Sequence, residues 1–181
     1  MNEETLILVD RQDNVNGFGE KLPVHQEGLL HRAFSIFLFD KHHRLMLQRR
    51  ALEKYHSGGL WTNCCCGHPR PGEETEAAAR RRLREEMGID CELYWTTSFI
   101  YRSSVSNGLI EHEFDHVFVG TFNGEPHPTP KEAADWKWVE KTDLLNWISK
   151  TPDDFTVWFR TIFDRNSGIG VHVDDFWPKV G

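Results

Sequence analysis

The sequence lacks a long hydrophobic run, a secretory start and an excess of basic residues. No apolar stretch approaches the roughly 20 residues that a membrane-spanning helix needs, so we expect no association with a membrane. Residues 1–4 carry neither the basic nor the apolar region of a signal peptide. Acidic residues number 28 against 21 basic ones, and the net charge of −7 argues against a general nucleic-acid-binding protein.

Cysteine is also scarce. Of the four cysteines, Cys64, Cys65 and Cys66 are adjacent and Cys91 stands alone. Adjacent residues of an extended segment point to opposite sides, so these three rarely form disulfides with one another. This is not the disulfide framework of a secreted protein, and we expect a cytoplasmic one.

Apolar material is plentiful. Hydrophobic residues make up 39% and aromatic residues 12% of the 181 positions, which excludes a disordered chain. A chain of this length buries a core without disulfides, and we expect a single domain over residues 1–181. The tail from about residue 165 has no clear periodicity and no expected role. No long apolar stripe marks an interface, so a monomer is expected and a dimer stays open.

Strand-like and helix-like segments alternate without a regular βαβ rhythm. This predicts an α/β or α+β fold, a mixed sheet covered by helices. Residues 10–19 are rich in turn formers, and a helix opens near Thr142 with a Thr or Asp cap. The expected strands are 6–9, 33–40, 44–49, 60–66, 93–101, 110–122 and 136–139, and the expected helices are 73–87, closed by Gly88, one from Thr142, and one from Thr151 to Phe163.

Three further expectations concern turns and the tail. The residues His42, His43 and His56 are expected in polar surface turns. The segment 14–21 is a plausible lid over a site. The tail residues 176–178, Phe-Trp-Pro, are expected to pack back on the domain.

One local pattern points to specific chemistry. Gly67 is followed by five residues, Glu73, seven more residues, and the run RRLREEMGI over 81–89. This resembles the Nudix box at every fixed position except one, because Arg82 stands where the family has its first helical Glu. In a Nudix hydrolase this helix face gathers carboxylates around Mg²⁺ held to a diphosphate. The resemblance therefore implies the Nudix fold and leaves hydrolysis in doubt; the alternative is an exposed helix with ion pairs such as Arg82 with Glu86.

A second pattern indicates the direction of the chemistry. Residues 61–69, WTNCCCGHP, resemble the WTNxxCGHP segment of the type I isopentenyl-diphosphate isomerases, which are Nudix-fold enzymes. The resemblance runs from about residue 6 to 163. It implies an enzyme that shifts the double bond of isopentenyl diphosphate to give dimethylallyl diphosphate. The further matching positions are His25, residues 31–35, residues 49–51, Tyr101, Arg102, residues 111–113 and Trp158.

Moving this double bond requires one proton added to an unactivated alkene and another removed from a different carbon. Two proton-transfer groups must then flank the substrate, and by resemblance these are Cys66 and Glu113, with Tyr101 supporting the carboxyl side. The resemblance places Trp158 over the carbocation formed between the two steps. Core packing is the preferred interpretation of Trp61, with a second cavity wall as the alternative.

Alternation along the extended segment places Cys64 on the same side as Cys66 and places Cys65 on the other. Small buried residues are the preferred interpretation of both Cys64 and Cys65. Cys64 as the nucleophile is the alternative.

A metal site is expected as well. Glu111 and Glu113 are two apart on a strand, so both point to one face, where they repel unless a cation or proton joins them. By resemblance, one divalent ion, Zn²⁺, Mn²⁺ or Mg²⁺, is bound by these two residues and by His25, His31 and His68. The alternative is a solvated acidic edge with unrelated histidines. Asp115 shares this face and could compete as a ligand.

The diphosphate of the substrate also needs partners. The resemblance favours Lys21, Arg50 and Lys54 as contacts, with Arg49 less favoured. Arg82 could contact the diphosphate that a Mg²⁺ on Glu86 bridges.

Two other functions stay open. One is a Nudix pyrophosphohydrolase that acts on nucleoside diphosphate derivatives. The other is a non-enzymatic zinc-binding module built on residues 64–68, whose ligands are too close for a tetrahedral finger.

Overall fold

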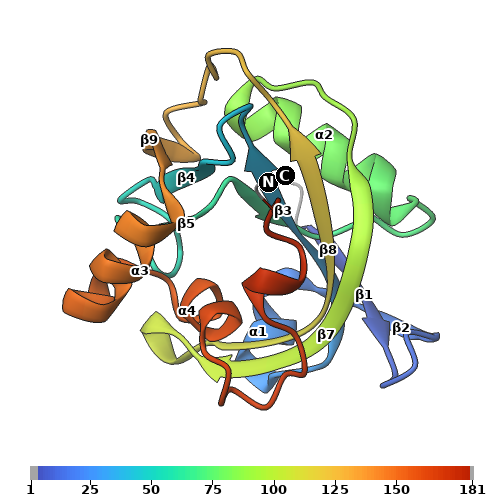
Figure 1. Ribbon diagram of the computed structural model, residues 1–181. Helices are drawn as coiled ribbons and strands as arrows, with labels where there is room; N and C mark the ends of the chain where they lie inside the picture. Colours follow the sequence, from blue (N-terminus) through green and yellow to red (C-terminus); the bar gives the residue numbers. More distant parts are fainter. Residues whose placement is uncertain (1–3, 180–181) are drawn as a thin grey trace.

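The computed structural model describes residues 4–179, which form a nine-stranded mixed sheet with helices on both faces (Figure 1). This confirms the predicted α+β fold. In chain order the elements are β1 (Thr5–Val9), β2 (Val15–Glu20), α1 (Lys21–Glu27), β3 (His31–Phe39), β4 (Leu45–Arg50), β5 (Trp61–Asn63), β6 (Cys65–Gly67), α2 (Thr75–Met87), β7 (Tyr94–Ser104), β8 (Ile110–Thr121), β9 (Ala133–Val139), α3 (Lys141–Lys150) and α4 (Val157–Phe163).

Strand β3 is the centre of the sheet. It pairs in parallel with β8 and antiparallel with β6. Strand β8 in turn pairs antiparallel with β7. The register places His31 opposite Glu113, and Ser35 opposite Cys66. Residues far apart in the sequence therefore meet along the N-terminal half of β3.

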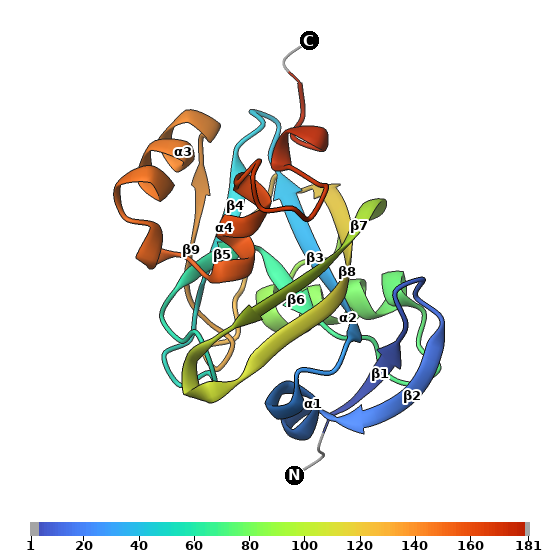
Figure 2. The same cartoon turned by 90° about the horizontal axis from the view of Figure 1, so that it is seen from below.

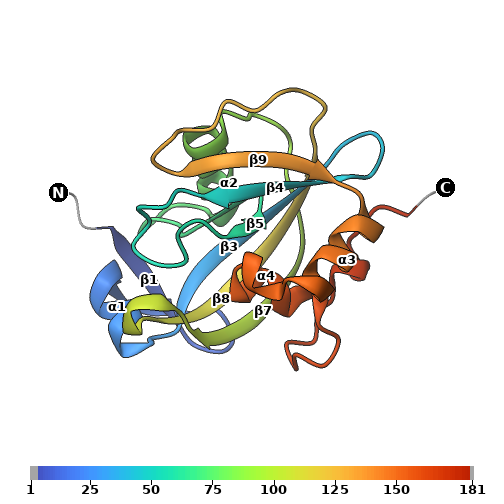
Figure 3. The same ribbon diagram turned by 90° about the vertical axis from the view of Figure 1, so that its left-hand side faces the viewer.

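Two apolar cores lie on opposite faces of the sheet, and alternation along β3 supplies both. Ile36 and Leu38 pack with α2, whereas Phe37 and Phe39 pack on the face covered by α4. Successive side chains of a strand point to opposite faces, so a strand apolar at every position is buried on both sides. Figures 2 and 3 show α2 on one face of the sheet and α3 and α4 on the other.

Helix α2 follows its prediction closely. It begins at Thr75, two residues later than expected, and ends at Met87. Gly88 takes the left-handed conformation with a φ of 63° and donates its N–H to the carbonyl of Arg84. Of the predicted apolar side, Ala78, Ala79 and Leu83 are buried, while Ala77 is exposed.

The segment 10–19, rich in turn formers, contains most of a strand that the sequence analysis did not expect. Its second half belongs to β2, which pairs with β1 along the register Thr5 to Glu20. The strand lies at the edge of the sheet and carries two glycines and exposed side chains. Its pairing depends on backbone hydrogen bonds, so its sequence shows no alternation of apolar and polar residues. The proposed lid, residues 14–21, coincides with β2 and the first residue of α1.

The last two predicted helices differ in detail. Helix α3 begins after Glu140 without a side-chain cap, so Thr142 and Asp143 lie inside its first turn. The helix predicted from Thr151 is split into a short 3-10 turn and α4. The split has a tertiary cause, because the amide of Thr156 donates to the carbonyl of Trp61 and holds this stretch extended.

The tail packs back on the sheet, as predicted. The ring of Trp177 lies 5.0 Å from that of Phe39, and the ring of Phe176 lies 4.9 Å from that of Phe37. Residues 1–3 of the acidic start and residues 180–181 of the tail lie outside the described part of the chain. Between residues 4 and 179, no helix has both the length and the apolarity that crossing a membrane requires.

Candidate active site

A single cavity brings together most of the residues singled out in the sequence. It opens between α1, the loop that follows β4, the end of β6, the helix α2 and strand β8. Of the predicted site residues, His25 and His31 lie behind its wall and Tyr101 lies beside it. The others line it: Lys21, Arg50, Lys54, Cys66, His68, Arg82, Glu86, Glu111, Glu113 and Trp158.

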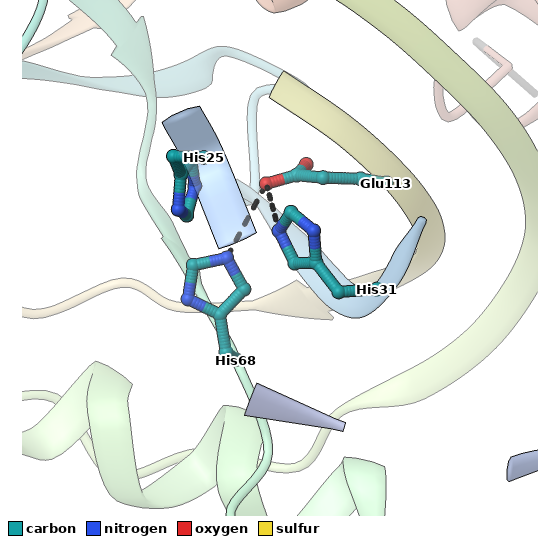
Figure 4. A group of neighbouring side chains, drawn as sticks. All are labelled: His25, His31, His68 and Glu113. Carbon is teal, nitrogen blue, oxygen red and sulfur yellow. Dashed lines mark hydrogen bonds and ion pairs between the residues drawn. The ribbon is translucent and has the colours of Figure 1, made fainter. Parts of the chain in front are cut away.

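Three imidazoles and a carboxylate converge at the inner end of this cavity (Figure 4). The Nε2 atom of His68 lies 3.4 Å from Oε1 of Glu113, and Nε2 of His31 lies 3.8 Å from the same oxygen. Nε2 of His25 lies 3.6 Å from Oε2 of Glu111. Four of the five predicted ligands therefore form one group of ligand atoms, and Glu111 adjoins it through His25, so that the five make up a histidine–glutamate cluster.

The polar atoms of this cluster test whether a cation fits. Within residues 4–179, Nε2 of His25, Nε2 of His31 and Oε2 of Glu111 are buried without a hydrogen-bond partner. Buried polar groups are almost always satisfied, so such a group of orphaned atoms needs a partner from outside the chain. All of them are ligand atoms that suit a divalent metal ion, and these His and Glu residues could hold one.

The outer ring nitrogens orient the imidazoles for this role. Nδ1 of His25 donates to the carbonyl of Lys21 at 2.7 Å, and Nδ1 of His31 donates to the carbonyl of Leu29 at 2.9 Å. Each bond leaves the Nε2 lone pair free and directed into the cluster, as in many protein metal sites.

Burial sets the charge of the cluster. It lowers the pKa of His31 to about 4 and holds the pKa of His68 well below its usual value, so both rings are neutral near pH 7. Burial and the neighbouring charge of Glu111 hold the pKa of Glu113 well above its ordinary value. For Glu111, the interactions with His25 and His56 outweigh burial and hold its pKa low. Neutral imidazoles are the form that binds a cation, and a cation bound at Glu113 would take the place of the proton that the raised pKa favours.

His56 contradicts the prediction of a surface turn. Its side chain is only 3% exposed, and its Nε2 lies 2.7 Å from Oε1 of Glu111. Together with His25 and Glu111 it forms a second group of ligand atoms. The sequence offered no signal for this contact, because residues 55–59 read as a polar turn.

The three adjacent cysteines occupy two environments. Cys64 and Cys65 are both buried in the core under α2, which confirms them as small buried residues. The prediction is correct for Cys65, which lies on the other side from Cys66, and wrong for Cys64, because the chain bends at Cys64 between β5 and β6 and its side chain lies in the core rather than at the cavity. Cys66 alone of the three lines the cavity.

The thiol of Cys66 lies among hydrogen-bond acceptors. Its Sγ lies 3.2 Å from Oδ1 of Asn63 and 3.6 Å from Oγ of Ser35. Burial and the nearby carboxyl of Asp115 raise the pKa of Cys66 to about 12. The thiol is therefore protonated near pH 7.

The predicted competitor Asp115 lies outside the ligand cluster. Its Oδ2 accepts a hydrogen bond from Ser35 at 2.6 Å, and the side chain is not among the grouped ligand atoms. Burial raises its pKa to about 7.

The aromatic residues separate into cavity and core. Trp158 of α4 lines the cavity, and the guanidinium of Arg50 lies 5.3 Å from its ring centre. Trp61 packs in the core against Trp147, so the interpretation as a second wall is wrong. Tyr101 pairs across the sheet with Glu113, and its buried hydroxyl finds no partner among the described residues.

Four cations line the outer part of the cavity, namely Lys21, Arg50, Lys54 and Arg82. Lys21 pairs with Glu4 at 2.7 Å and Lys54 pairs with Glu132 at 2.6 Å. Arg82 reaches Oε1 of Glu86 at 2.5 Å, so the helix-face ion pair expected as an alternative is present. Arg49 does not line the cavity; its side chain bonds the carbonyl of Gly59.

Comparisons with known proteins agree with this geometry. A family model described as the NUDIX domain matches residues 29–159. An isopentenyl-diphosphate Delta-isomerase 2 of Aromatoleum aromaticum is 59% identical over 163 residues, which cover 90% of this chain and 86% of that protein. An isopentenyl-diphosphate Delta-isomerase of Serratia proteamaculans is 53% identical over 178 residues, which cover 98% of each chain. The chain belongs to the isopentenyl-diphosphate Delta-isomerase family.

A solved structure confirms the fold of this family member. The crystal structure of DR0079 from Deinococcus radiodurans superposes with a TM-score of 0.68 at 24% identity, covering 81% of this chain and 90% of that one. The Nudix fold expected from the box is therefore confirmed. The zinc-module interpretation is wrong, because Cys64 and Cys65 lie in the core and no cysteine takes part in the grouped ligand atoms of residues 4–179.

Proposed function

We propose that this isomerase-family enzyme interconverts isopentenyl and dimethylallyl diphosphate, with Cys66 and Glu113 as the groups that exchange protons with the substrate. The observation that supports these roles most directly is that the thiol and the carboxyl line one cavity, between a cationic rim and an aromatic wall. Isomerisation without a redox cofactor needs such a pair and little else.

In the reaction, the alkene π electrons of the substrate take up a proton from one of the two groups. The tertiary carbocation that results then loses a proton from the adjacent methylene carbon to the other group. The electrons of that C–H bond form the new double bond, and the roles of Cys66 and Glu113 exchange in the reverse direction. The protonated state of Cys66 near pH 7 suits a group that holds a proton until the alkene arrives.

Two aromatic residues support this chemistry. The indole of Trp158 would attract the carbocation through its π face, an interaction of about 0.5–2 kcal/mol. Tyr101, across the strand pair from Glu113, would support the carboxyl through its buried hydroxyl.

The proposed metal centre consists of His25, His31, His68, Glu111 and Glu113. When bound, a divalent ion there, Zn²⁺, Mn²⁺ or Mg²⁺, would neutralise the repulsion of the two carboxylates and hold Glu113 in place. The mixture of nitrogen and oxygen ligands accommodates all three metals.

The outer cations would hold the diphosphate. Lys21, Arg50 and Lys54 line the cavity, and Arg82 reaches the same space from α2. Guanidinium groups bind phosphate oxygens in bidentate fashion and ammonium groups act as point charges. Glu86 would supply one ligand to a Mg²⁺ that bridges the diphosphate, while Arg82 balances the charge of the carboxylate.

We also propose a monomeric protein of the cytoplasm. All four cysteines are free thiols, the state that a reducing compartment maintains. Light scattering after gel filtration should give the mass of one chain.

A proton NMR time course of isopentenyl diphosphate tests the proposal. With protein loaded with Zn²⁺ and supplied with Mg²⁺, signals of dimethylallyl diphosphate should grow for the wild type. Cys66→Ala should lose activity by about three orders of magnitude or more, because one of the two proton-transfer groups is gone. The matched control is Cys91→Ala, which removes a half-exposed thiol outside the cavity. Full turnover by Cys66→Ala would refute the role of the thiol.

The hydrolase interpretation makes a different prediction for the same samples. Glu73, Glu85 and Glu86 of the box are all present. Arg82 already binds Glu86, which weakens a hydrolytic metal cluster on this helix. Release of phosphate from nucleoside diphosphate derivatives, without any allylic signal from isopentenyl diphosphate, would favour hydrolysis.

A further inference from the structure

His56 is a buried histidine that the proposed reaction does not use. It lines the cavity from the loop between β4 and β5, and its ring is in edge contact with Trp158 at 5.8 Å between ring centres. Its closest polar partner is Oε1 of Glu111 at 2.7 Å. A histidine with 3% exposure, directed at a carboxylate of the metal cluster, calls for a role.

The loop is built to hold the ring in this position. A Cβ on Gly58 would lie 2.3 Å from the carbonyl oxygen of Leu52, so only glycine permits the tight return of the chain. Arg50 donates to the carbonyl of His56 itself at 3.1 Å. Asn107 donates to the carbonyl of Tyr55 at 2.7 Å, from the turn between β7 and β8. Contacts from both sides of the cavity therefore fix the backbone that carries the imidazole.

The hydrogen bonds also determine which ring nitrogen carries the proton. A carboxylate only accepts hydrogen bonds, and Nε2 of His56 lies 2.7 Å from Oε1 of Glu111, so Nε2 is the donor. Nδ1 then accepts from the hydroxyl of Ser57, 3.1 Å away. These two hydrogen bonds connect Ser57 to His56 and His56 to Glu111, and Oε1 of Glu111 is the acceptor of the second.

The other oxygen of the same carboxylate is left for a different partner. Oε2 of Glu111 has no hydrogen bond among the described residues and lies 3.6 Å from Nε2 of His25. We infer that His56 is a positioning residue of the metal centre: it binds one oxygen of Glu111 and so presents the other to the ion. This inference rests on the metal centre of the proposed function and adds a residue that touches its ligand rather than the ion.

A pair of substitutions separates this role from simple packing. His56→Gln keeps an N–H donor near the place of Nε2, whereas His56→Leu keeps volume without a donor. Loss of a hydrogen-bonding neighbour of a metal ligand typically weakens metal binding by 10–100-fold. We therefore expect the dissociation constant for Mn²⁺ to rise about 10–100-fold in His56→Leu and to stay within about threefold of the wild type in His56→Gln. The matched control, His42→Leu, removes an exposed histidine and should leave binding unchanged.

Mn²⁺ itself is the probe, and the measurement is the electron paramagnetic resonance signal of the free ion during titration of the metal-free protein. Circular dichroism and thermal unfolding of the metal-free variants monitor folding. If His56→Leu is folded and binds Mn²⁺ as tightly as the wild type, the inference is wrong. If His56→Leu does not fold, His56→Gln and Ser57→Ala replace it in the test. Wild-type affinity of His56→Gln together with binding that is about two- to fivefold weaker in Ser57→Ala supports the inference.

Two other outcomes are informative. Binding by His56→Gln that is as weak as that of a folded His56→Leu would make His56 a ligand in its own right, and would overturn the positioning role. A wild-type protein that binds no Mn²⁺ at all but still isomerises the substrate would overturn the metal centre of the proposed function. Normal binding by the wild type and by every variant would overturn only the inference about His56.

Discussion

The helix α2 and the histidine–glutamate cluster are two places where this chain gathers carboxylates, and the two satisfy them in opposite ways. At α2 the partners are arginines of the helix: Arg81 lies 2.8 Å from Glu73, which precedes the helix, and Arg82 lies 2.6 Å from Glu85 and 2.5 Å from Glu86. In the cluster, Glu111 and Glu113 lie beside imidazoles, and the inner nitrogens of His25 and His31 lack hydrogen-bond partners among the described residues.

The two regions differ in whether arginines of the chain supply the positive charge. The helix carries its own positive charges, so its carboxylates are already balanced. The cluster places two carboxyls beside three imidazoles, and these groups of ligand atoms could hold an added cation. In this chain the candidate metal ligands lie in the cluster, near the start of β3, while carboxylates of α2 are paired with arginines.

The two regions should differ most when one carboxyl is replaced by an amide in each: the replacement in the cluster should cause the largest effect and the one on α2 a small effect. We expect Glu113→Gln to reduce the isomerisation rate by about a thousandfold or more, because it removes a proton-transfer group and a metal ligand together. Glu85→Gln on α2, the control, should stay within about threefold, since this side chain is partly exposed and pairs with arginines. Turnover of isopentenyl diphosphate measured by NMR compares the two variants. Equal losses of rate would contradict the assignment of proton transfer to the cluster rather than to α2.

Metal content should separate the regions as well. His31→Gln removes one of the inward-facing nitrogens, and we expect the affinity for Mn²⁺ to fall about 100-fold. Glu85→Gln should keep the wild-type affinity at this site. Titration of the metal-free proteins with Mn²⁺ tests both, and retention of tight binding by His31→Gln would place the ion elsewhere.

The next effect concerns the ion pair that links α2 to the cavity. Arg82→Gln should raise the KM for isopentenyl diphosphate about tenfold with kcat changed less than threefold, because one phosphate contact of about 1.4 kcal/mol is lost while the proton-transfer pair remains. Arg80→Gln, the control, removes an arginine whose ion pair within residues 4–179 is with the exposed Glu76. A fall in kcat with unchanged KM would mean that Arg82 acts on the chemistry rather than on binding.

The smallest effect should be a pH-dependent one on α2. The hydrogen bond from Arg81 holds the pKa of Glu73 below its ordinary value of 4.5. The stabilisation is therefore complete above pH 4.5 and disappears as the pH falls through the lower, folded-state pKa.

Urea unfolding of Glu73→Gln should accordingly show a loss of up to about 1 kcal/mol at pH 7 and little difference from the wild type near pH 3. Glu76→Gln, at a more exposed pair, should show less at both values. A loss that grows toward low pH would contradict the assigned direction of the shift.

Local patterns predicted the regular parts of this molecule well. The run of 73–87 with Gly88 behind it predicts α2 because capping and helical periodicity act over a few residues. The continuous apolar run of 33–40 predicts a strand buried on both faces, as found for β3. The site residues were named through their resemblance to a family, and the structure brings all of them into or beside one cavity.

The errors share one physical cause, which is a contact with a distant part of the chain. Pairing with β1 turns residues 15–20 into a strand, the carbonyl of Trp61 interrupts the last helix, and the bend at Cys64 redirects its side chain into the core under α2. None of these contacts produces a signal in the local sequence, because secondary-structure propensity depends on only a few neighbouring residues.

By itself, the sequence determined the kind of elements, the amphipathic and doubly apolar segments that form them, and the residue types available for the chemistry. The tertiary structure alone decided which of these residues are buried and what they face. Burial made His31 and His68 neutral and left their nitrogens directed at the carboxylates. It also turned His56 from a residue of a polar loop into a partner of Glu111, because charge and hydrogen bonding depend on neighbours that only folding brings together.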